Sequence, residues 1–286
     1  SIMSTHGEQY GNEEAATYDE VDATRVFSRT LVGALTKSVW WKEGLTMLDY
    51  GCGTGLNTIA LSSQCSFILA ADVSQPMLDQ LEKKLQLDPA AKSKIHVKKI
   101  EPDGSGLGDE LFDVVITSLV LHHAGDNAGE IVKKLCSKLK PNGKLLIFEF
   151  NPTEKTRKFF AGHDHSHSHS HQHGDSHQHH GHSHEHHGHS HEHHGHSHEH
   201  SHENSHQHSH QHSHEHNHEQ QKVDLNEKTT MVRGKHRIDW LDAPEVDKLL
   251  TTNGMKIERT DFVELDVQLR EMRGMMDCFI TIGEKI

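Results

Sequence analysis

Apolar residues along most of the chain follow two alternating patterns. Over residues 20–41 they include Phe27, Leu31, Leu35 and Val39, at the three- to four-residue spacing of an amphipathic helix. Beyond this helix, short runs that are almost entirely apolar alternate with further segments of helical spacing. Short apolar runs bounded by turn residues are typical of strands that are buried on both faces of a sheet.

The predicted strands and helices follow one another in a regular order. The strands are expected at residues 46–50, 67–73, 95–100, 112–121, 144–150, 255–267 and 275–286. Helices are expected at residues 56–64, 128–140 and 243–254, and from Ser74 onward. Such alternation predicts an α/β fold of three layers, doubly wound around a mostly parallel, seven-stranded sheet. Since no helix separates the last two strands, we expect them to form an antiparallel pair at the edge.

Two helix boundaries carry recognisable signals. Ser74 is a candidate N-cap, with Pro76 in the first turn of the helix that follows. The helix at residues 128–140 is expected to stop at the sequence Pro141-Asn142-Gly143.

A histidine-rich tract interrupts this order after the fifth predicted strand. Of the 33 histidines, 28 lie in residues 163–218, and residues 180–200 repeat HGHSHEH three times. The tract contains no Val, Ile, Leu, Pro or aromatic residue, so it cannot bury apolar area and is expected to be disordered. We therefore predict a core in two parts, residues 1–161 and 223–286, with an insertion at residues 162–222.

The charge of the chain argues against general affinity for nucleic acid. The formal net charge is −13, and the tract contributes seven acidic residues and no Lys or Arg, which leaves −6 on the remainder. The sequence shows no signal peptide and no apolar run long enough to span a bilayer, so no membrane partner is expected. The four cysteines form no CxxC pair, which favours a reducing compartment. We therefore expect a cytoplasmic protein, with the nucleus as the alternative.

The strongest chemical signal is the sequence LDYGCGTG, residues 48–55, between a predicted strand and a predicted helix. Glycines at alternate positions allow the tight turn and the close backbone approach that nucleotide-type ligands require. The spacing is G-x-G-x-G, because Leu56 occupies the position where a dinucleotide fingerprint would place its third glycine. Asp72, at the end of the second predicted strand, is suited to accept hydrogen bonds from ribose hydroxyls.

Four segments in this order resemble the motifs of class I S-adenosylmethionine-dependent methyltransferases. They are residues 48–55, Asp72, residues 112–123 (FDVVITSLVLHH) and residues 139–150 (LKPNGKLLIFEF). The earlier AATYDE, residues 15–20, resembles the segment that precedes the core in small-molecule members such as the ubiquinone and menaquinone methyltransferases. The resemblance covers roughly residues 10–155 and, more weakly, residues 236–286.

The resemblance implies a set of residues that bind S-adenosylmethionine. Asp49 and the three glycines would hold its methionine part, Asp72 its ribose, and one of Glu101 and Asp103 its adenine amine. Val73 and Met77 would pack near the adenine, and Ser118 and Leu119 would lie near the sulfonium. Tyr18 would cover the cofactor. The full set is Tyr18, Asp49, Gly51, Gly53, Gly55, Asp72, Val73, Met77, Ser118 and Leu119.

The expected function is methyl transfer to an unidentified acceptor, which we expect to be a small molecule. His122 and His123 follow the fourth predicted strand, where one of them could act as a general base or orient the substrate. Alternatively, the pair shapes the loop through hydrogen bonds. Arg237 and Trp240, just after the tract, are candidates for binding the acceptor, with Arg237 suited to an anionic group.

The tract leaves several hypotheses open. Alternating histidines suit Zn²⁺, Ni²⁺ or Cu²⁺, and representative ligands are His182, His184, His189, His191, His196 and His198. The tract could instead be a neutral repeat expansion or a pH-responsive lid. These readings leave two alternative functions, a metal-buffering protein on a methyltransferase scaffold and a protein methyltransferase gated by metal.

Overall fold

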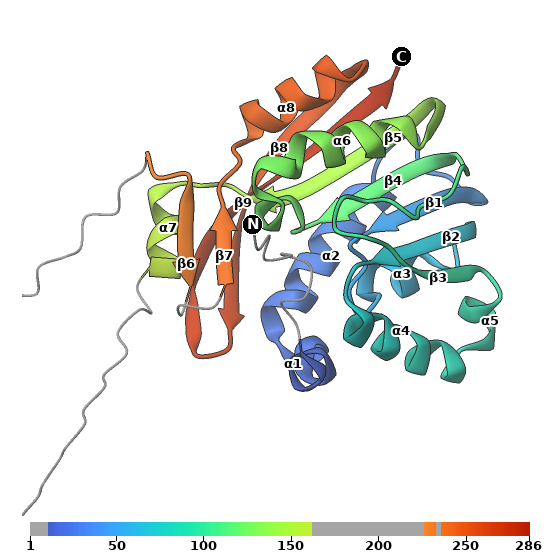
Figure 1. Ribbon diagram of the computed structural model, residues 1–286, viewed down its shortest axis with the longest axis horizontal. Coiled ribbons are helices and arrows are strands. Elements are labelled where there is room, and N and C mark those ends of the chain that lie inside the picture. Colours follow the sequence, from blue (N-terminus) through green and yellow to red (C-terminus); the bar gives the residue numbers. More distant parts are fainter. Residues whose placement is uncertain (1–10, 162–225, 233–235) are drawn as a thin grey trace, which may run out of the picture. The chain divides into compact units, whose positions relative to one another are not determined.

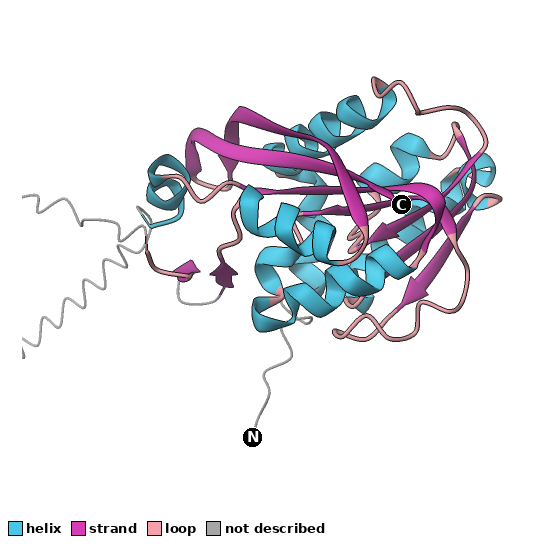
Figure 2. Ribbon diagram, turned by 90° about the horizontal axis from the view of Figure 1, so that it is seen from above, coloured by secondary structure: helices cyan, strands magenta, loops and turns pink. Residues whose placement is uncertain are grey.

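In the computed structural model, which describes residues 11–161, 226–232 and 236–286, seven strands form one sheet between two layers of helices (Figure 1). The strand order is β3-β2-β1-β4-β5-β9-β8. The bounds are β1 Leu45–Tyr50, β2 Cys65–Asp72, β3 Ile95–Lys99, β4 Phe112–Ser118, β5 Leu139–Phe150, β8 Met255–Leu269 and β9 Met272–Lys285. Strands β1 to β5 run parallel, and β9 pairs antiparallel with β5 and β8. Helices lie on both sides of the strands (Figure 2). The predicted fold class is confirmed.

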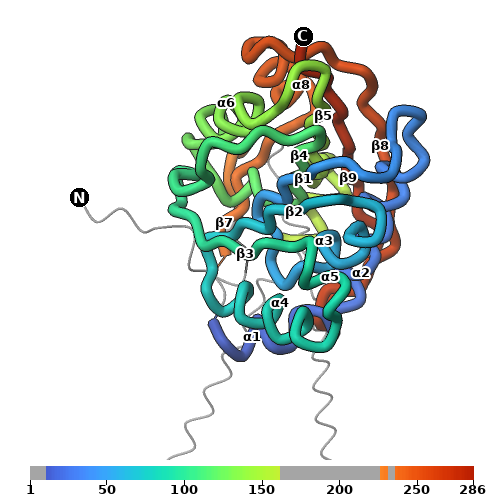
Figure 3. Tube along the Cα trace, turned by 90° about the vertical axis from the view of Figure 1, so that its right-hand side faces the viewer, coloured from blue at the N-terminus to red at the C-terminus, as the bar shows by residue number. Residues whose placement is uncertain are grey.

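The helices cover both faces of the sheet and close two hydrophobic cores (Figure 3). The bounds are α1 Asn12–Thr17, α2 Asp22–Thr36, α3 Leu56–Leu61, α4 Gln75–Leu87, α5 Pro89–Lys92, α6 Ala128–Ser137, α7 Glu154–Ala161 and α8 Ala243–Thr252. Buried residues of α2, α3 and α4 join one core, and those of α6 and α8 join the other. Within β1, Met47 belongs to the first core and Leu48 to the second, as the two-residue period of a strand requires. In the described part of the chain, no helix is both long and apolar enough to cross a bilayer.

The order of the strands creates a crevice above β1 and β4. From β1 the chain proceeds outward to β2 and β3, and then returns to place β4 on the other side of β1. The loops that follow β1 and β4 therefore diverge at the carboxyl ends of these two strands. In open α/β sheets, ligands bind at such a reversal of strand order.

Several predicted boundaries differ from the structure. The helix that begins at Asp22 ends at Thr36, so Val39 lies beyond it and is fully exposed. The Pro-Asn-Gly sequence does not terminate a helix, because α6 already ends at Ser137. The sequence lies within β5, where the register with β4 shifts and Asn142 has a φ of 62°. A left-handed residue lets one strand bulge without breaking its pairing.

A short hairpin, β6 Thr229–Val232 and β7 His236–Asp239, was not predicted. Its strands are only four residues long, which is too short for a clear apolar period. It lies beside α7 (Figure 1). Arg157 of α7 donates a hydrogen bond from Nη1 to the carbonyl oxygen of Glu227, at 2.6 Å. The described residues on either side of the tract are therefore held together. The predicted disorder of the tract itself falls outside the described residues.

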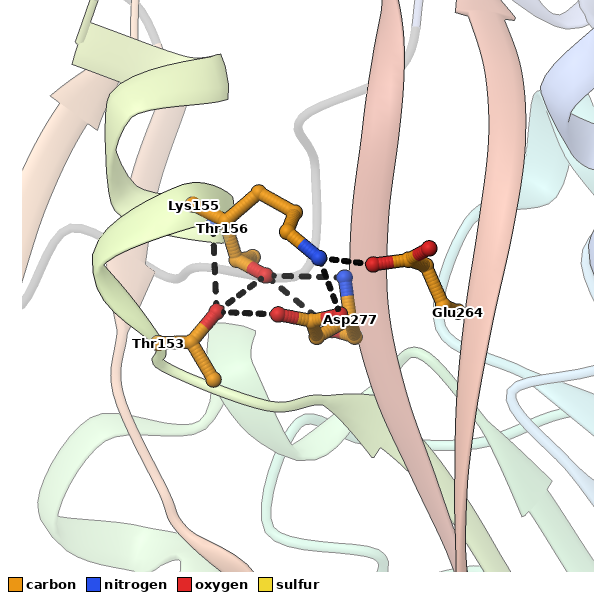
Figure 4. Close-up of polar contacts among 5 residues, drawn as sticks. All are labelled: Thr153, Lys155, Thr156, Glu264 and Asp277. Atoms are coloured by element: carbon orange, nitrogen blue, oxygen red, sulfur yellow. Dashed lines mark hydrogen bonds and ion pairs between the residues drawn. The ribbon is translucent and has the colours of Figure 1, made fainter.

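A polar network fastens the first turn of α7 to β9 (Figure 4). The hydroxyl of Thr153 donates to Oδ2 of Asp277 at 2.6 Å, and Thr156 exchanges two hydrogen bonds with the backbone of Asp277. Lys155 forms ion pairs with Asp277 and with Glu264 on β8. Asp277 thus accepts a hydrogen bond from Thr153 at the start of α7 and pairs with Lys155 of the same helix.

Replacing Asp277 with alanine should lower the free energy of unfolding by about 1–2 kcal/mol, because the Thr153 hydroxyl and Lys155 lose their shared acceptor. Glu264→Ala is the matched control, since Glu264 is half exposed and pairs with Lys155. Its cost should be below about 1 kcal/mol. Urea unfolding of both variants compares them, and equal costs would contradict the role given to Asp277.

Candidate active site

The three glycines after β1 all have left-handed backbone conformations but meet different surroundings. Their φ angles are 73°, 53° and 80° for Gly51, Gly53 and Gly55. A Cβ atom on Gly51 would lie 2.3 Å from Cγ2 of Val120, and one on Gly55 would lie 2.4 Å from Cδ1 of Leu81. A Cβ on Gly53 would meet nothing within 4 Å. Gly51 and Gly55 therefore allow close packing against Val120 and Leu81, whereas the space beside Gly53 is open.

Asp72, the last residue of β2, ties the glycine turn to the start of α4. Its Oδ2 accepts a hydrogen bond from the amide of Gly53 and its Oδ1 one from the amide of Ser74, both at 2.8 Å. Burial raises the pKa of this carboxyl, and the backbone hydrogen bonds oppose that shift. Ser74 stands at the N-cap position as predicted, but its hydroxyl makes no capping bond and has no hydrogen-bond partner.

Asp49 lies beneath the glycine turn and is completely enclosed. Burial raises its pKa to about 7, against the effect of a 2.5 Å hydrogen bond from the hydroxyl of Thr58. Its other oxygen, Oδ1, is buried without a hydrogen-bond partner. A buried carboxylate oxygen without a donor is costly, so a ligand that supplied one would be favoured.

The segment before α2 covers the glycine turn. Asp19, in the short turn of helix η2 (Tyr18–Glu20), accepts a hydrogen bond from the hydroxyl of Thr54 at 2.5 Å. The same carboxylate forms an ion pair with Lys84 of α4 at 2.5 Å. These contacts hold the neighbouring Tyr18 over the turn, where it lines the cavity described below.

The opposite wall is the sharp turn that follows β4. Leu119 adopts a left-handed conformation with a φ of 56°, and its amide donates to the carbonyl oxygen of Phe148 at 2.8 Å. The turn continues into helix η3, Leu121–His123. His122 is buried, and its Nδ1 lies 2.8 Å from Oε2 of Glu149.

Arg237 of β7 reaches the same wall from the far side of the tract. Its Nε and Nη2 lie 2.7 and 2.6 Å from Oδ1 of Asp239, which holds the guanidinium in place. Oδ2 of Asp239 is buried without a hydrogen-bond partner. Trp240 lies elsewhere. It is buried against Phe160 and under Arg157, and its Nε1 donates to the hydroxyl of Thr230.

These walls enclose a cavity of about 910 Å³. Most residues predicted to bind cofactor or acceptor line it: Tyr18, Gly51, Gly53, Asp72, Val73, Met77, Ser118, Leu119, His123 and Arg237. Glu101 and Asp103 both line it as well, so the alternatives for the adenine amine stay open. Asp49, Gly55, His122 and Trp240 do not line it, although Asp49 and His122 each neighbour a lining residue along the chain.

The predicted metal ligands, His182, His184, His189, His191, His196 and His198, lie outside the described residues. Among the residues that are described, no three or more His, Cys, Asp or Glu side chains form a group able to hold a metal ion. The described lining of the cavity offers hydrogen-bonding and apolar groups.

Known proteins share both the sequence motifs and the fold. Residues 48–147 match the family model of a methyltransferase domain. The magnesium protoporphyrin IX methyltransferase of Synechocystis, solved with bound S-adenosylhomocysteine, aligns over 91% of this chain and 82% of its own, with a TM-score of 0.53 and 16% identity. An S-adenosylmethionine-dependent methyltransferase of Methanosarcina mazei aligns over 86% and 94%, with a TM-score of 0.55 and 15% identity. Residues 48–147 are therefore a methyltransferase domain, and the chain has the fold of these solved methyltransferases.

Curated relatives match less than half of this chain. An uncharacterised methyltransferase of Schizosaccharomyces pombe is 38% identical over 114 residues, which are 38% of this chain and 39% of the relative. A demethylmenaquinone methyltransferase of Lactobacillus johnsonii is 34% identical over 111 residues, 38% of this chain and 45% of the relative. The chain thus spans less than half the length of these relatives.

Sequence reasoning missed several residues that shape the site. Asp19 directly follows the predicted Tyr18, so the AATYDE segment did contain a signal for it. Glu149 stands in the predicted fifth strand, where a lone acidic residue among apolar ones marks a buried functional or structural carboxylate. Asp239 carried no such signal, because only the unpredicted hairpin places it behind Arg237.

Gly53→Ala should weaken S-adenosylhomocysteine binding by at least about tenfold, because its methyl group would enter the open space of the cavity. The backbone cost should be only about 1–2 kcal/mol, since a left-handed alanine is strained but does not clash there. Gly44→Ala is the matched control: its φ is 84°, nothing lies near its Cβ, and it does not line the cavity. Calorimetric titration checks the pair, and equal affinities would contradict the role of Gly53.

Asp49→Asn should raise the free energy of unfolding of the ligand-free protein above pH 7. The folded-state pKa is raised from 3.8 to about 7, so ionised Asp49 destabilises the fold fully above pH 7 and not at all below about pH 4. The gain from asparagine should therefore shrink as the pH falls through that window. Urea unfolding between pH 4 and 8 measures it, and a pH-independent difference would contradict the raised pKa.

Proposed function

We propose that this methyltransferase transfers the methyl group of S-adenosylmethionine to a small-molecule acceptor. The observation that carries the proposal is that one cavity at the reversal of strand order has Asp72 and the open Gly53 at one wall and His123 and Arg237 at another. One wall has the groups suited to a nucleoside, and the other has groups able to bind and deprotonate a second molecule.

The residues present fit the cofactor on four counts. Asp72 has a hydrogen bond on each oxygen and keeps lone pairs for ribose hydroxyls. Asp49 has a buried oxygen without a donor, which a positively charged amino group, directly or through a water, would satisfy. Gly53 leaves the space that a side chain would fill. Met77 and Val73 supply apolar surface for the adenine ring, with Tyr18 covering the turn.

The cofactor, when bound, supplies a methyl group that its sulfonium already activates. The chain's own residues then have to orient the acceptor and keep water away from it. His123 is placed to accept a proton if the acceptor atom carries one, since imidazole is a base near neutral pH. Arg237, fixed by Asp239, is placed to bind an anionic or carbonyl group of the acceptor.

Two considerations favour a small acceptor. The cavity volume of about 910 Å³ lies in the range, roughly 300–1,000 Å³, that small-molecule sites occupy. Relatives at about one-third identity include a demethylmenaquinone methyltransferase, and a cypemycin N-terminal methyltransferase of Streptomyces is equally similar. All four cysteines are free and buried, which suits a reducing compartment, and we place the reaction in the cytoplasm.

Radiolabelled transfer tests the proposal. The intact protein is incubated with methyl-labelled S-adenosylmethionine and, separately, the small-molecule and protein fractions of a cell extract. We expect label in the small-molecule fraction, and His123→Ala should reduce its rate by about 10²-fold or more if His123 is the base. Arg237→Ala should weaken transfer without changing the affinity for S-adenosylhomocysteine.

Label confined to the protein fraction would contradict the small-molecule acceptor, and no label with either fraction would contradict the proposed activity. The affinity for S-adenosylhomocysteine is also measured with added zinc. Since the described cavity residues form no metal-binding group, we expect zinc to leave the affinity for S-adenosylhomocysteine unchanged.

A further inference from the structure

Glu149 is a buried acidic residue to which the proposed mechanism gives no part. It stands near the carboxyl end of β5, is 2% exposed, and does not line the cavity. Its neighbours along the strand, Phe148 and Phe150, are core residues. A carboxylate in such a place is costly unless its oxygens receive hydrogen bonds.

Both oxygens of Glu149 meet the turn that follows β4. Oε1 accepts a hydrogen bond from the amide of Leu121 at 2.6 Å. Oε2 lies 2.8 Å from Nδ1 of His122. The Glu149 side chain therefore binds two successive residues of η3, Leu121 and His122. These bonds hold the turn in position and orient the His122 ring.

These two contacts of Glu149 also affect the cavity wall. The ring of His122 contacts the rings of Phe150 and His123, at centroid distances of 4.8 and 4.0 Å. His123 lines the cavity, as do Leu119 and Val120 of the same turn. The orientation of His122 thus decides where the ring of His123 can lie.

We propose that Glu149 is a positioning residue: it anchors residues 119–123 and fixes His122 in the tautomer that carries its proton on Nδ1, thereby setting His123 against the acceptor end of the cavity. The inference deepens the proposed function and rests on it. A carboxylate only accepts hydrogen bonds, so the proton shared by Oε2 and Nδ1 belongs to the imidazole.

Glu149→Gln tests the tautomer with almost no change in shape. The amide of Leu121 can only donate, so it selects the carbonyl oxygen of glutamine and leaves the NH₂ group facing Nδ1. His122 must then accept at Nδ1 and carry its proton on Nε2. Long-range ¹H–¹⁵N spectra of the full chain distinguish the two tautomers, and the signal of His122 is the one that His122→Asn removes. We expect a change of tautomer, and the same tautomer in both proteins would overturn the inference.

Glu149→Ala tests the anchoring of the wall. It leaves two buried donors without an acceptor, and we expect the dissociation constant for S-adenosylhomocysteine to rise by about tenfold or more, whereas Glu149→Gln should stay within about threefold of wild type. The matched control is Asp113→Asn, which weakens bonds to Thr46 and Lys140 at the opposite end of β4. It should lower stability and leave the affinity unchanged.

The outcomes separate the inference from the proposed function. If Glu149→Ala binds S-adenosylhomocysteine as tightly as wild type, or if Asp113→Asn weakens binding equally at similar loss of stability, the positioning role is wrong. If the wild-type protein does not bind S-adenosylhomocysteine, the proposed function fails, and the tautomer measurement still decides what Glu149 does to His122.

Discussion

The two backbone hydrogen bonds accepted by Asp72 are the constraint on which the site depends. They join the end of β2, the glycine turn after β1 and the first residues of α4 at one buried carboxylate. Burial makes this charge costly, as its raised pKa shows, and the two amides offset that cost. The same arrangement leaves the remaining lone pairs of the carboxylate at the cavity wall. A group that fixes the loop is therefore also available to a ligand.

The rest of the cavity is built by segments that are distant along the chain. Asp19 brings the N-terminal segment over the glycine turn through Thr54 and Lys84. Glu149 holds the turn after β4 through the amide of Leu121, and Arg237 lines the cavity from β7 of the hairpin. Arg157 links that hairpin's entry to α7. The described residues on both sides of the tract are therefore anchored to the fold.

The sequence predicted the parts of the fold that depend on local pattern. Alternating apolar runs and helical spacing gave the order of elements, and the glycine spacing with Asp72 indicated which loop would meet a ligand. What pattern could not show is how distant side chains share hydrogen bonds. The partnership of Glu149 with His122 and that of Asp239 with Arg237 join residues from different elements. Trp240 illustrates the same limit, since its neighbours Arg157 and Phe160 come from across the tract.

The central claim is that this cavity binds the methyl donor through Asp72. Calorimetric titration of the intact protein and of Asp72→Ala with S-adenosylhomocysteine tests it most directly. The account predicts saturable, one-to-one binding in the micromolar range by the wild-type protein, and a loss of at least about tenfold in affinity in the variant. Equal binding by both proteins would show that Asp72 does not hold the ligand, and no binding by either would contradict the assignment of the cavity.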